Sequence, residues 1–179
     1  MKQNKRIGID LDGVVYDLIG EFDKMLISKG IEPNLFQYSR GLSPSQVHEY
    51  LEEFSWGHPF LTIPTYPNAI NSINELNKTL DVYLITHRDW CDYGIADTIR
   101  RLHDDKVKFT DLIFSPNKGS EAKKFNIDYF VEDNLENARY ITKLSNSKVF
   151  LIDREYNKSK DLKGIRRVKD LSRVVEILK

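Results

Sequence analysis

The residues best suited to chemistry follow the first apolar run of the chain. Asp10 and Asp12 stand two positions apart, directly before Gly13. In an extended strand, residues spaced i, i+2 point to the same side, so the two carboxylates face one way. Two close carboxylates repel each other, and one takes up a proton unless a cation lies between them. The pair therefore suits a divalent metal site or a nucleophile beside a proton donor; the plain alternative is a polar strand end entering a glycine turn.

Two later segments carry groups that suit phosphate. Thr86, His87 and Arg88 lie at the end of the apolar run that begins at Val82. A hydroxyl, backbone N–H groups and a guanidinium at the carboxyl end of a strand can hold phosphate oxygens. Lys118 follows another apolar run and can neutralise phosphate or carboxylate charge. The plain alternatives are an ordinary strand-terminal threonine, solvated loop residues and an exposed lysine.

Two adjacent acids, Glu132 and Asp133, close the apolar run Tyr129–Val131, next to a helix start at Asn134. Taken alone, acids in this position are also favoured by the dipole of the helix. Each of the four features, however, falls at the carboxyl end of a different predicted strand. A parallel sheet would therefore bring acids, a hydroxyl and a lysine to one edge.

The apolar pattern predicts the sheet that must position these groups. Five short runs are rich in Ile, Val, Tyr and Phe, and most lack alternation with polar residues, as strands buried on both faces do. They are Arg6–Leu11, Val82–Thr86, Leu112–Ser115, Tyr129–Val131 and Val149–Ile152. Amphipathic helical patterns lie between them, at Asn68–Lys78, Tyr93–Asp104 and Asn134–Leu144, and Asp170 is placed to cap a last helix. This alternation predicts an α/β fold with a Rossmann-like doubly wound parallel sheet.

One interval breaks the alternation. Between the first strand and Asn68 there is no good strand pattern, and an apolar helical stripe runs from Leu18 to Leu26. Ser43-Pro44-Ser45-Gln46 resembles a capping box with Pro at the first helical position, which predicts a second helix. We therefore expect a small helical insertion over residues 16–64, with residues 1–15 and 65–179 forming the core. Such an insertion would lie over the carboxyl ends of the strands, where α/β folds bind ligands.

Taken in order, these residues resemble the motifs of the haloacid dehalogenase (HAD) superfamily of phosphotransferases. Asp10-Leu11-Asp12-Gly13-Val14-Val15 is similar to its first motif. Thr86, Lys118 and Glu132-Asp133 are similar to its second, third and fourth motifs. The resemblance implies a HAD-like core in which the insertion forms a small helical cap.

Within the superfamily the sequence looks like the 5'(3')-deoxyribonucleotidase group. The similarity lies in the short cap after the first motif, in Tyr66-Pro67-Asn68-Ala69, in Thr86-His87-Arg88 and in the run Ile127–Asp133. The stretch from Trp56 to Phe60 is similar to an aromatic stretch that touches the nucleobase in that group. Trp56 and Phe60 would stack on a base, with the equal alternative that they form the core of the insertion.

The resemblance implies Mg2+-dependent hydrolysis of a phosphate monoester through an aspartyl-phosphate. Asp10 would be the nucleophile, and Asp12 the general acid and base. Asp10, Asp133 and the backbone carbonyl of Asp12 would hold Mg2+. Glu132 would orient a water molecule bound to the metal. Phosphate oxygens would be bound by Thr86 and Lys118, and His87 and Arg88 complete the predicted phosphate-binding set.

Other activities stay open from the sequence. They are a phosphatase for a sugar phosphate or another small metabolite, a polynucleotide 3'-phosphatase, and a non-enzymatic binding module that keeps the fold. The presence of both Asp10 and Asp12 counts against the binding module. Asp12 also counts against haloacid dehalogenation, because a leaving halide needs no acid.

The composition narrows the partners. The 179 residues contain 27 Lys plus Arg and 27 Asp plus Glu, so the formal net charge is zero. This argues against a long polyanionic partner and favours a small phosphorylated substrate, with a nucleoside monophosphate as the preferred kind. The single cysteine, Cys91, and the lack of an apolar window of roughly 18 residues indicate a cytoplasmic protein without a membrane partner. No stable nucleic-acid complex is expected, and monomer and homodimer both stay open.

Overall fold

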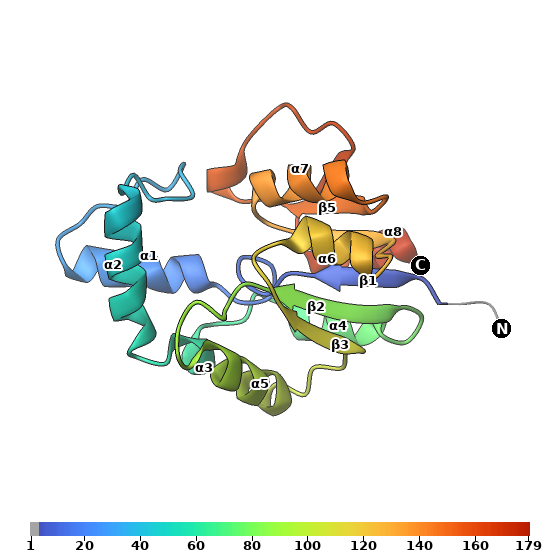
Figure 1. Ribbon diagram of the computed structural model, residues 1–179, viewed down its shortest axis with the longest axis horizontal. Helices are drawn as coiled ribbons and strands as arrows, with labels where there is room; N and C mark the ends of the chain where they lie inside the picture. Colours follow the sequence, from blue (N-terminus) through green and yellow to red (C-terminus); the bar gives the residue numbers. More distant parts are fainter. Residues whose placement is uncertain (1–3) are drawn as a thin grey trace.

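The computed structural model describes residues 4–179, in which the strands form one six-stranded sheet. Neighbouring strands are parallel and follow the order β3-β2-β1-β4-β5-β6 (Figure 1). The strands are β1 (Arg6–Ile9), β2 (Asp81–Thr86), β3 (Asp111–Phe114), β4 (Tyr129–Glu132), β5 (Lys148–Ile152) and β6 (Ile165–Val168). This order defines a Rossmann-like doubly wound sheet, so the predicted fold class is confirmed.

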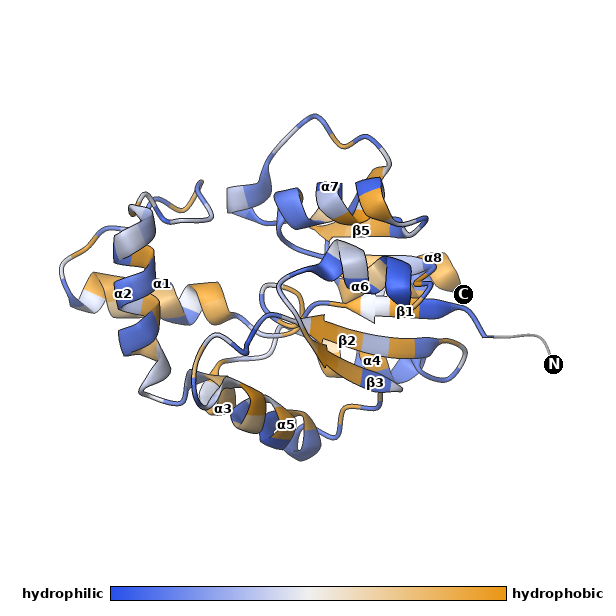
Figure 2. Cartoon of the chain, in the orientation of Figure 1, coloured by the Kyte–Doolittle hydropathy of each residue, from blue (hydrophilic) through white to orange (hydrophobic). Residues whose placement is uncertain are grey.

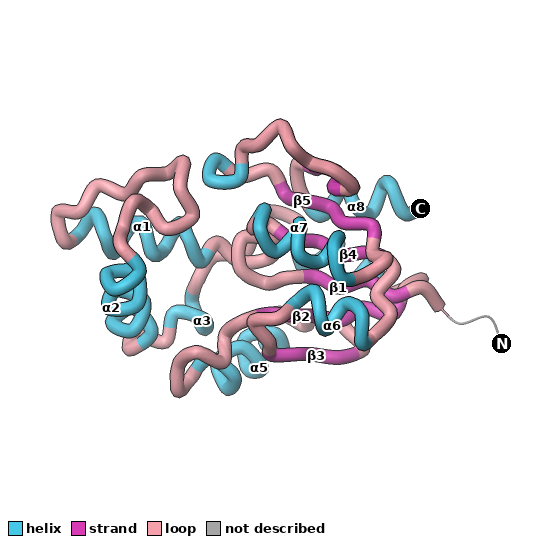
Figure 3. The backbone as a smooth tube through the Cα atoms, turned by 45° about the horizontal axis from the view of Figure 1, so that its top comes forward, coloured by secondary structure: helices cyan, strands magenta, loops and turns pink. Residues whose placement is uncertain are grey.

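Helices cover both faces of the sheet (Figure 3). The helices are α1 (Leu18–Ser28), α2 (Pro44–Ser55), α3 (Pro59–Thr62), α4 (Ala69–Leu76), α5 (Gly94–Asp104), α6 (Lys118–Lys124), α7 (Leu135–Leu144) and α8 (Leu171–Leu178), with a 3-10 turn at Glu155–Asn157. Side chains of α4, α5 and α8 share one buried cluster, and side chains of α6 and α7 share the other. Strand residues alternate between the clusters, with Leu84 in the first and Ile85 in the second. Figure 2 shows the resulting concentration of hydrophobic residues in the strands.

The predicted insertion contains α1 and α2, which lie together at one end of the molecule, away from the sheet (Figure 1). Ser43 caps α2 and Gln46 returns the bond, so the predicted capping box is present. The two ends of the insertion turn back into the core, because Tyr16 and Phe60 are buried with the strand residues. The boundaries at residues 16 and 64 stay a prediction, and residues 1–3 of the first core segment lie outside the described residues.

Three elements were not expected from the sequence, namely β6, α3 and α6. β6 is an edge strand that buries its two ends, Ile165 and Val168, and places two arginines between them, so its apolar signal is weak. In α6, Ala122 is the one apolar side chain that is buried. Between residues 4 and 179, no helix has both the length and the apolar character needed to cross a membrane.

Candidate active site

β1 and β4 lie next to each other and end at the same edge of the sheet. Ile9 is in register with Val131, and the N–H of Asp10 donates to the carbonyl of Val131 at 3.0 Å. This pairing places Asp10 beside Glu132 and Asp133, and the three buried carboxyl groups offer oxygen atoms within 4.8 Å of one another. In a doubly wound sheet this edge is where the strand order reverses and where ligands bind.

One ammonium group lies among these carboxyl groups. Lys118, the first residue of α6, is 5% exposed, and its Nζ lies 2.5 Å from Asp10 Oδ2 and 3.2 Å from each oxygen of Glu132. Asn137 of α7 donates to Glu132 at 2.6 Å and so fixes the carboxylate that faces Lys118. Burial disfavours the charge of Lys118, but the carboxylates of Asp10 and Glu132 outweigh this effect and raise its pKa.

The cluster holds more acidic groups than basic ones. Burial and the neighbouring Asp10 carboxylate raise the pKa of Asp133 to about 7, against the lowering effects of Tyr156 and Lys118. Burial and Asp10 also raise the pKa of Glu132 well above its usual range. The single ammonium offsets only part of the charge of three carboxyl groups, whose oxygens fit a divalent cation such as Mg2+, which prefers oxygen ligands.

The turn after Asp12 brings the backbone against Asp133. Gly13 has a φ of +74°, and a Cβ at this position would lie 1.9 Å from Asp133 Oδ2. Glycine is therefore required here both by the backbone conformation and by the space. Arg154 donates to the carbonyl of Gly13 at 2.7 and 3.0 Å, and the hydroxyl of Tyr156 donates to Asp133.

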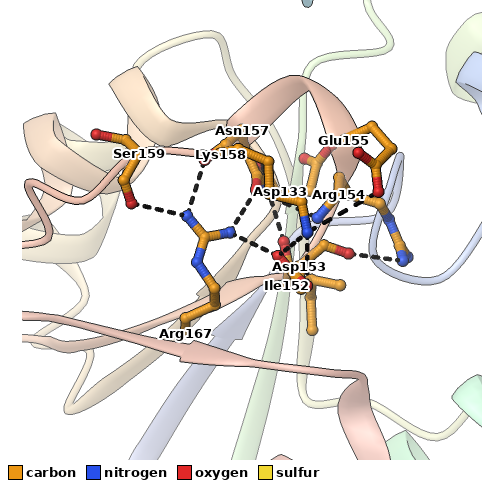
Figure 4. A network of polar contacts seen from close by, with 9 residues as sticks. All are labelled: Asp133, Ile152, Asp153, Arg154, Glu155, Asn157, Lys158, Ser159 and Arg167. Carbon is orange, nitrogen blue, oxygen red and sulfur yellow. Dashed lines mark hydrogen bonds and ion pairs between the residues drawn. The ribbon is translucent and has the colours of Figure 1, made fainter. Parts of the chain in front are cut away.

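The loop after β5 is hydrogen-bonded to Asp133, just past β4, and to Arg167 of β6 (Figure 4). Asn157 donates to the carbonyl oxygens of Asp133 and Ile152 at 2.6 and 2.7 Å. Arg167 of β6 donates to the side chain of Asn157 at 2.6 Å and to Asp153 at 2.9 Å. These bonds hold the loop rigidly beside the carboxylate cluster.

Sequence reasoning missed Arg154 and Tyr156 as parts of the site. Both residues lie shortly after β5, and a position just after a strand is also what identified Asp10 as a candidate. Tyr156 also meets the insertion, because the ring of Tyr38 packs on it edge to face at 5.5 Å. Tyr38 is 50% exposed as a whole, yet desolvation of its hydroxyl and the charge of Asp133 raise its pKa.

Thr86 ends β2 at the same edge of the sheet. β2 pairs with β1, with Leu84 in register with Ile9. Thr86 is fully buried, and among residues 4–179 its Oγ1 has no hydrogen-bond partner. A buried hydroxyl without a partner costs about 1–3 kcal/mol, so Thr86 is a donor ready for an acceptor that enters the site.

Asp12 is engaged differently from the other acids. Arg88 donates from Nε and Nη2 to the two oxygens of Asp12, at 2.9 and 2.6 Å. We call this pair of donors, Nε and Nη2, the fork of Arg88. The neighbouring residue His87 is exposed. The structure brings together Asp10, Glu132, Asp133 and Lys118, sets Thr86 at the same edge, and pairs Asp12 with Arg88. The catalytic and phosphate-binding roles expected for these residues stay predictions.

The two aromatic residues expected at the substrate lie in different surroundings. Trp56 is 68% exposed, whereas Phe60 is 1% exposed. The ring of Phe60 lies 4.4 Å from the guanidinium of Arg88 and packs edge to face on Trp90 at 6.1 Å. Phe60 therefore has a core position, and a base-stacking role for either residue stays a prediction.

The fold is shared with hydrolases of known structure. No protein-family model and no curated protein matches the sequence. A haloacid dehalogenase-like hydrolase from Streptococcus pneumoniae matches with a TM-score of 0.67 at 14% identity, over 100% of both chains. CbbY from Rhodobacter sphaeroides, solved in complex with phosphate, matches with a TM-score of 0.60 at 12% identity, over 96% of both chains. A 2-haloacid dehalogenase from Pseudomonas syringae matches with a TM-score of 0.57 at 14% identity, over 98% of both chains.

At these identities the likeness concerns the fold. It extends over the insertion as well as the sheet, because nearly the whole of each chain is covered. The fold that the motifs implied is therefore present: the chain has a HAD-like fold, with its acidic cluster at the carboxyl edge of the sheet.

Proposed function

We propose that this protein is a Mg2+-dependent phosphomonoester hydrolase that acts through an aspartyl-phosphate on Asp10. The observation that carries the proposal is the buried group of Asp10, Glu132 and Asp133 against the ammonium of Lys118. It combines a nucleophile, ligands for a divalent cation and a fixed positive charge at one edge of the sheet. The hydroxyl of Thr86 at that edge has no partner in the described part of the chain, which supports a phosphate group as its acceptor.

Asp10 and Asp133 would hold the cation together with the backbone carbonyl of Asp12. Glu132 is less available, because both of its oxygens accept from Lys118 and one also accepts from Asn137. Its role is to orient Lys118. When bound, the cation would offset negative charge on the phosphoryl group.

The reaction has two steps on the side chains of this chain. Asp10 attacks phosphorus through a carboxylate oxygen, and the bond to the alkoxide of the substrate breaks while Asp12 gives that alkoxide a proton. Asp12 then takes a proton from a water molecule whose oxygen attacks phosphorus, which breaks the bond to Asp10 and releases inorganic phosphate. Lys118 and Thr86 bind phosphate oxygens in both steps.

The proposed substrate is a small phosphorylated molecule, with a nucleoside monophosphate preferred. The resemblance to deoxyribonucleotidases through the insertion and Thr86-His87-Arg88 supports a nucleotide, and the zero net charge of the chain favours a small substrate over a long nucleic acid. A sugar phosphate is the second candidate, because the core position of Phe60 leaves one fewer aromatic face for a base.

The likeness to a 2-haloacid dehalogenase raises the alternative of carbon–halogen cleavage. Asp12 favours the phosphatase. A halide leaves without a proton, whereas an alkoxide needs one, so only the phosphatase gives a second carboxyl group a use as an acid in the step that releases the leaving group.

Release of inorganic phosphate from dTMP, dUMP and glucose 6-phosphate, with and without Mg2+, tests the proposal. We expect Mg2+-dependent release by the wild-type protein and none by Asp10→Asn, with the fold of the variant intact by circular dichroism. Asp104→Asn, an exposed position on α5, is the matched control and should keep full activity. Full activity of Asp10→Asn would refute the mechanism, equal rates on all three esters would refute base specificity, and halide release from a 2-haloacid would favour the dehalogenase.

A further inference from the structure

Arg88 is the largest side chain that is fully buried. Its guanidinium is always charged, and Nε and Nη2 grip the two oxygens of Asp12 in a fork at 2.9 and 2.6 Å. Nη1 donates to the hydroxyl of Thr98 at 3.3 Å. A two-point contact of this kind fixes the rotation of the carboxylate as well as its place.

Two aromatic rings complete the surroundings of Arg88. The guanidinium carbon lies 4.4 Å from the ring centre of Phe60 and 5.1 Å from that of Tyr16, and both contacts are favourable cation–π interactions. The ring of Tyr16 is itself held, because its hydroxyl donates to Asp105 of the α5 end at 2.9 Å. Arg88 is therefore enclosed by groups that restrict its own movement.

Tyr16 and Phe60 come from the two linkers that join the insertion to the sheet. Tyr16 lies on the outgoing linker and forms β-bridges to Asp12 and to Thr65. Phe60 lies in α3 on the returning linker, and Arg101 of α5 donates to the carbonyl of Leu61 in the same helix at 2.6 Å. Both connections of the insertion thus pack on the residue that holds Asp12.

Stability alone does not account for this arrangement. Taking two charges out of water costs several kcal/mol, and apolar side chains of similar volume are often as stable as a buried ion pair. What an ion pair in a fork supplies in addition is a fixed orientation of the carboxylate.

We propose that Arg88 is the positioning residue for Asp12, and that the linkers of the insertion hold it in place through Tyr16 and Phe60. The inference rests on the proposed function, in which Asp12 gives a proton to the leaving alkoxide. Arg88 does not touch the substrate; it acts through the carboxylate that it orients. Displacement of a reacting group by about 1 Å costs on the order of 100-fold in rate, so orientation has a measurable effect.

The choice of leaving group separates positioning from a general structural role. p-Nitrophenyl phosphate releases a stable anion and needs little help from an acid, whereas glycerol phosphate releases an alkoxide that needs a proton. We expect Arg88→Lys, which keeps the charge and loses the fork, to lower kcat on glycerol phosphate about 100-fold and to change kcat on p-nitrophenyl phosphate only a few-fold. The double variant Asp12→Asn/Arg88→Lys should be no slower than Asp12→Asn, because both changes remove the same function.

The matched control is Arg100→Lys, an exposed arginine on α5, which should leave both rates unchanged. Equal losses of Arg88→Lys on the two esters would overturn the proposal, as would additive losses in the double variant. If Arg88→Lys does not fold, Phe60→Leu takes its place. It removes the ring face and keeps apolar volume, so a smaller loss confined to glycerol phosphate is expected, and an unselective loss would overturn the role of the linkers.

A readout independent of activity separates this inference from the proposed function. If the wild-type protein released no phosphate from either ester, the proposed function would fall. The crystal structure of Arg88→Lys would still decide the inference. A rotated Asp12 carboxylate supports positioning by Arg88, and an unchanged carboxylate refutes it.

Discussion

Asp10 and Asp12 lie two residues apart, just past the end of β1, and each pairs with a different basic residue. Asp10 shares the single ammonium of Lys118 with Glu132 and lies close to a third carboxyl group. Asp12 has the whole fork of Arg88 to itself. The first arrangement lacks positive charge and suits a cation and a phosphate, whereas the second is complete within the chain. The two residues are of one type, so the difference between their surroundings comes from their partners.

Replacing Lys118, the partner of Asp10, or Arg88, the partner of Asp12, tests this comparison most strongly. Loss of one member of a buried ion pair costs about 3–5 kcal/mol of unfolding free energy, so Lys118→Met and Arg88→Met should both lose this much. Mg2+ should raise the unfolding free energy of Lys118→Met by more than it raises that of the wild type, because the cation replaces the missing charge. Its effect on Arg88→Met should equal its effect on the wild type.

Urea unfolding with and without saturating Mg2+ measures these differences. Binding to the folded state at 100 times the dissociation constant adds about 2.7 kcal/mol, which is well above the error of the method. The same gain from Mg2+ in both variants would show that the two regions do not differ in their need for a cation.

Gly13 lies between the two regions, and the atoms nearest to a side chain added there belong to Asp133 and Tyr156. In Gly13→Ala the positive φ costs about 1–2 kcal/mol, and the new Cβ would displace Asp133. Gly30→Ala is the matched control, because Gly30 has a φ of +76° and nothing within 4 Å of an added Cβ. Calorimetry should detect a large loss of Mg2+ affinity in Gly13→Ala and none in Gly30→Ala. Similar affinities in the two variants would contradict the placement of Asp133 among the ligands.

The strands differ in how clearly the sequence predicts them. Buried parallel strands leave nearly continuous apolar runs, so β1, β2, β4 and β5 were predictable. The edge strand β3 is only partly buried, but it keeps the apolar run Leu112–Phe114 and was predictable as well. The alternation of these strands with helices implied the doubly wound sheet. The edge strand β6 was not predictable, because arginines occupy its centre. The apolar pattern indicates a strand where apolar residues follow one another, and it gives no signal where charged residues interrupt them.

For the site, the sequence indicated which residues reach the carboxyl edge, since strand ends in a parallel sheet meet there. It did not indicate which partner each residue takes. The sequence places Arg88 two positions after Thr86 and predicts it at phosphate, and that role stays a prediction. In the structure Arg88 donates to Asp12 and packs on Tyr16 and Phe60. Pairing across distant segments depends on packing that no local pattern records.

Tyr156→Phe sharpens the comparison on the cluster side. The change removes the hydroxyl that donates to Asp133 and keeps the ring that packs on Tyr38. Loss of a group that orients a metal ligand lowers metal affinity about 10–100-fold, and we expect the lower end because Asp133 is also fixed through Asn157. Tyr140→Phe, at a surface tyrosine, should bind Mg2+ like the wild type. Unchanged affinity in Tyr156→Phe would leave its hydroxyl without a part in the site.

Thr86 and Thr98 are both buried, and they differ in the hydrogen bonds of their hydroxyl groups. Thr86 at the cluster edge has no partner for its hydroxyl within residues 4–179, whereas the hydroxyl of Thr98 accepts from Arg88 and donates to the carbonyl of Gly94 at 2.6 Å. Thr86→Val should therefore keep or raise the unfolding free energy of the free protein, by up to about 1 kcal/mol, while Thr98→Val should lower it by about 1 kcal/mol.

The gain in stability from inorganic phosphate should follow the opposite order in the two threonine variants. If the hydroxyl of Thr86 binds phosphate, as proposed, added phosphate with Mg2+ should stabilise Thr98→Val as much as the wild type and Thr86→Val less. Thermal unfolding with and without phosphate measures both effects. If Thr86→Val were destabilised without phosphate and stabilised normally with it, the hydroxyl of Thr86 would have a structural role, and the phosphate site would have to be sought away from the end of β2.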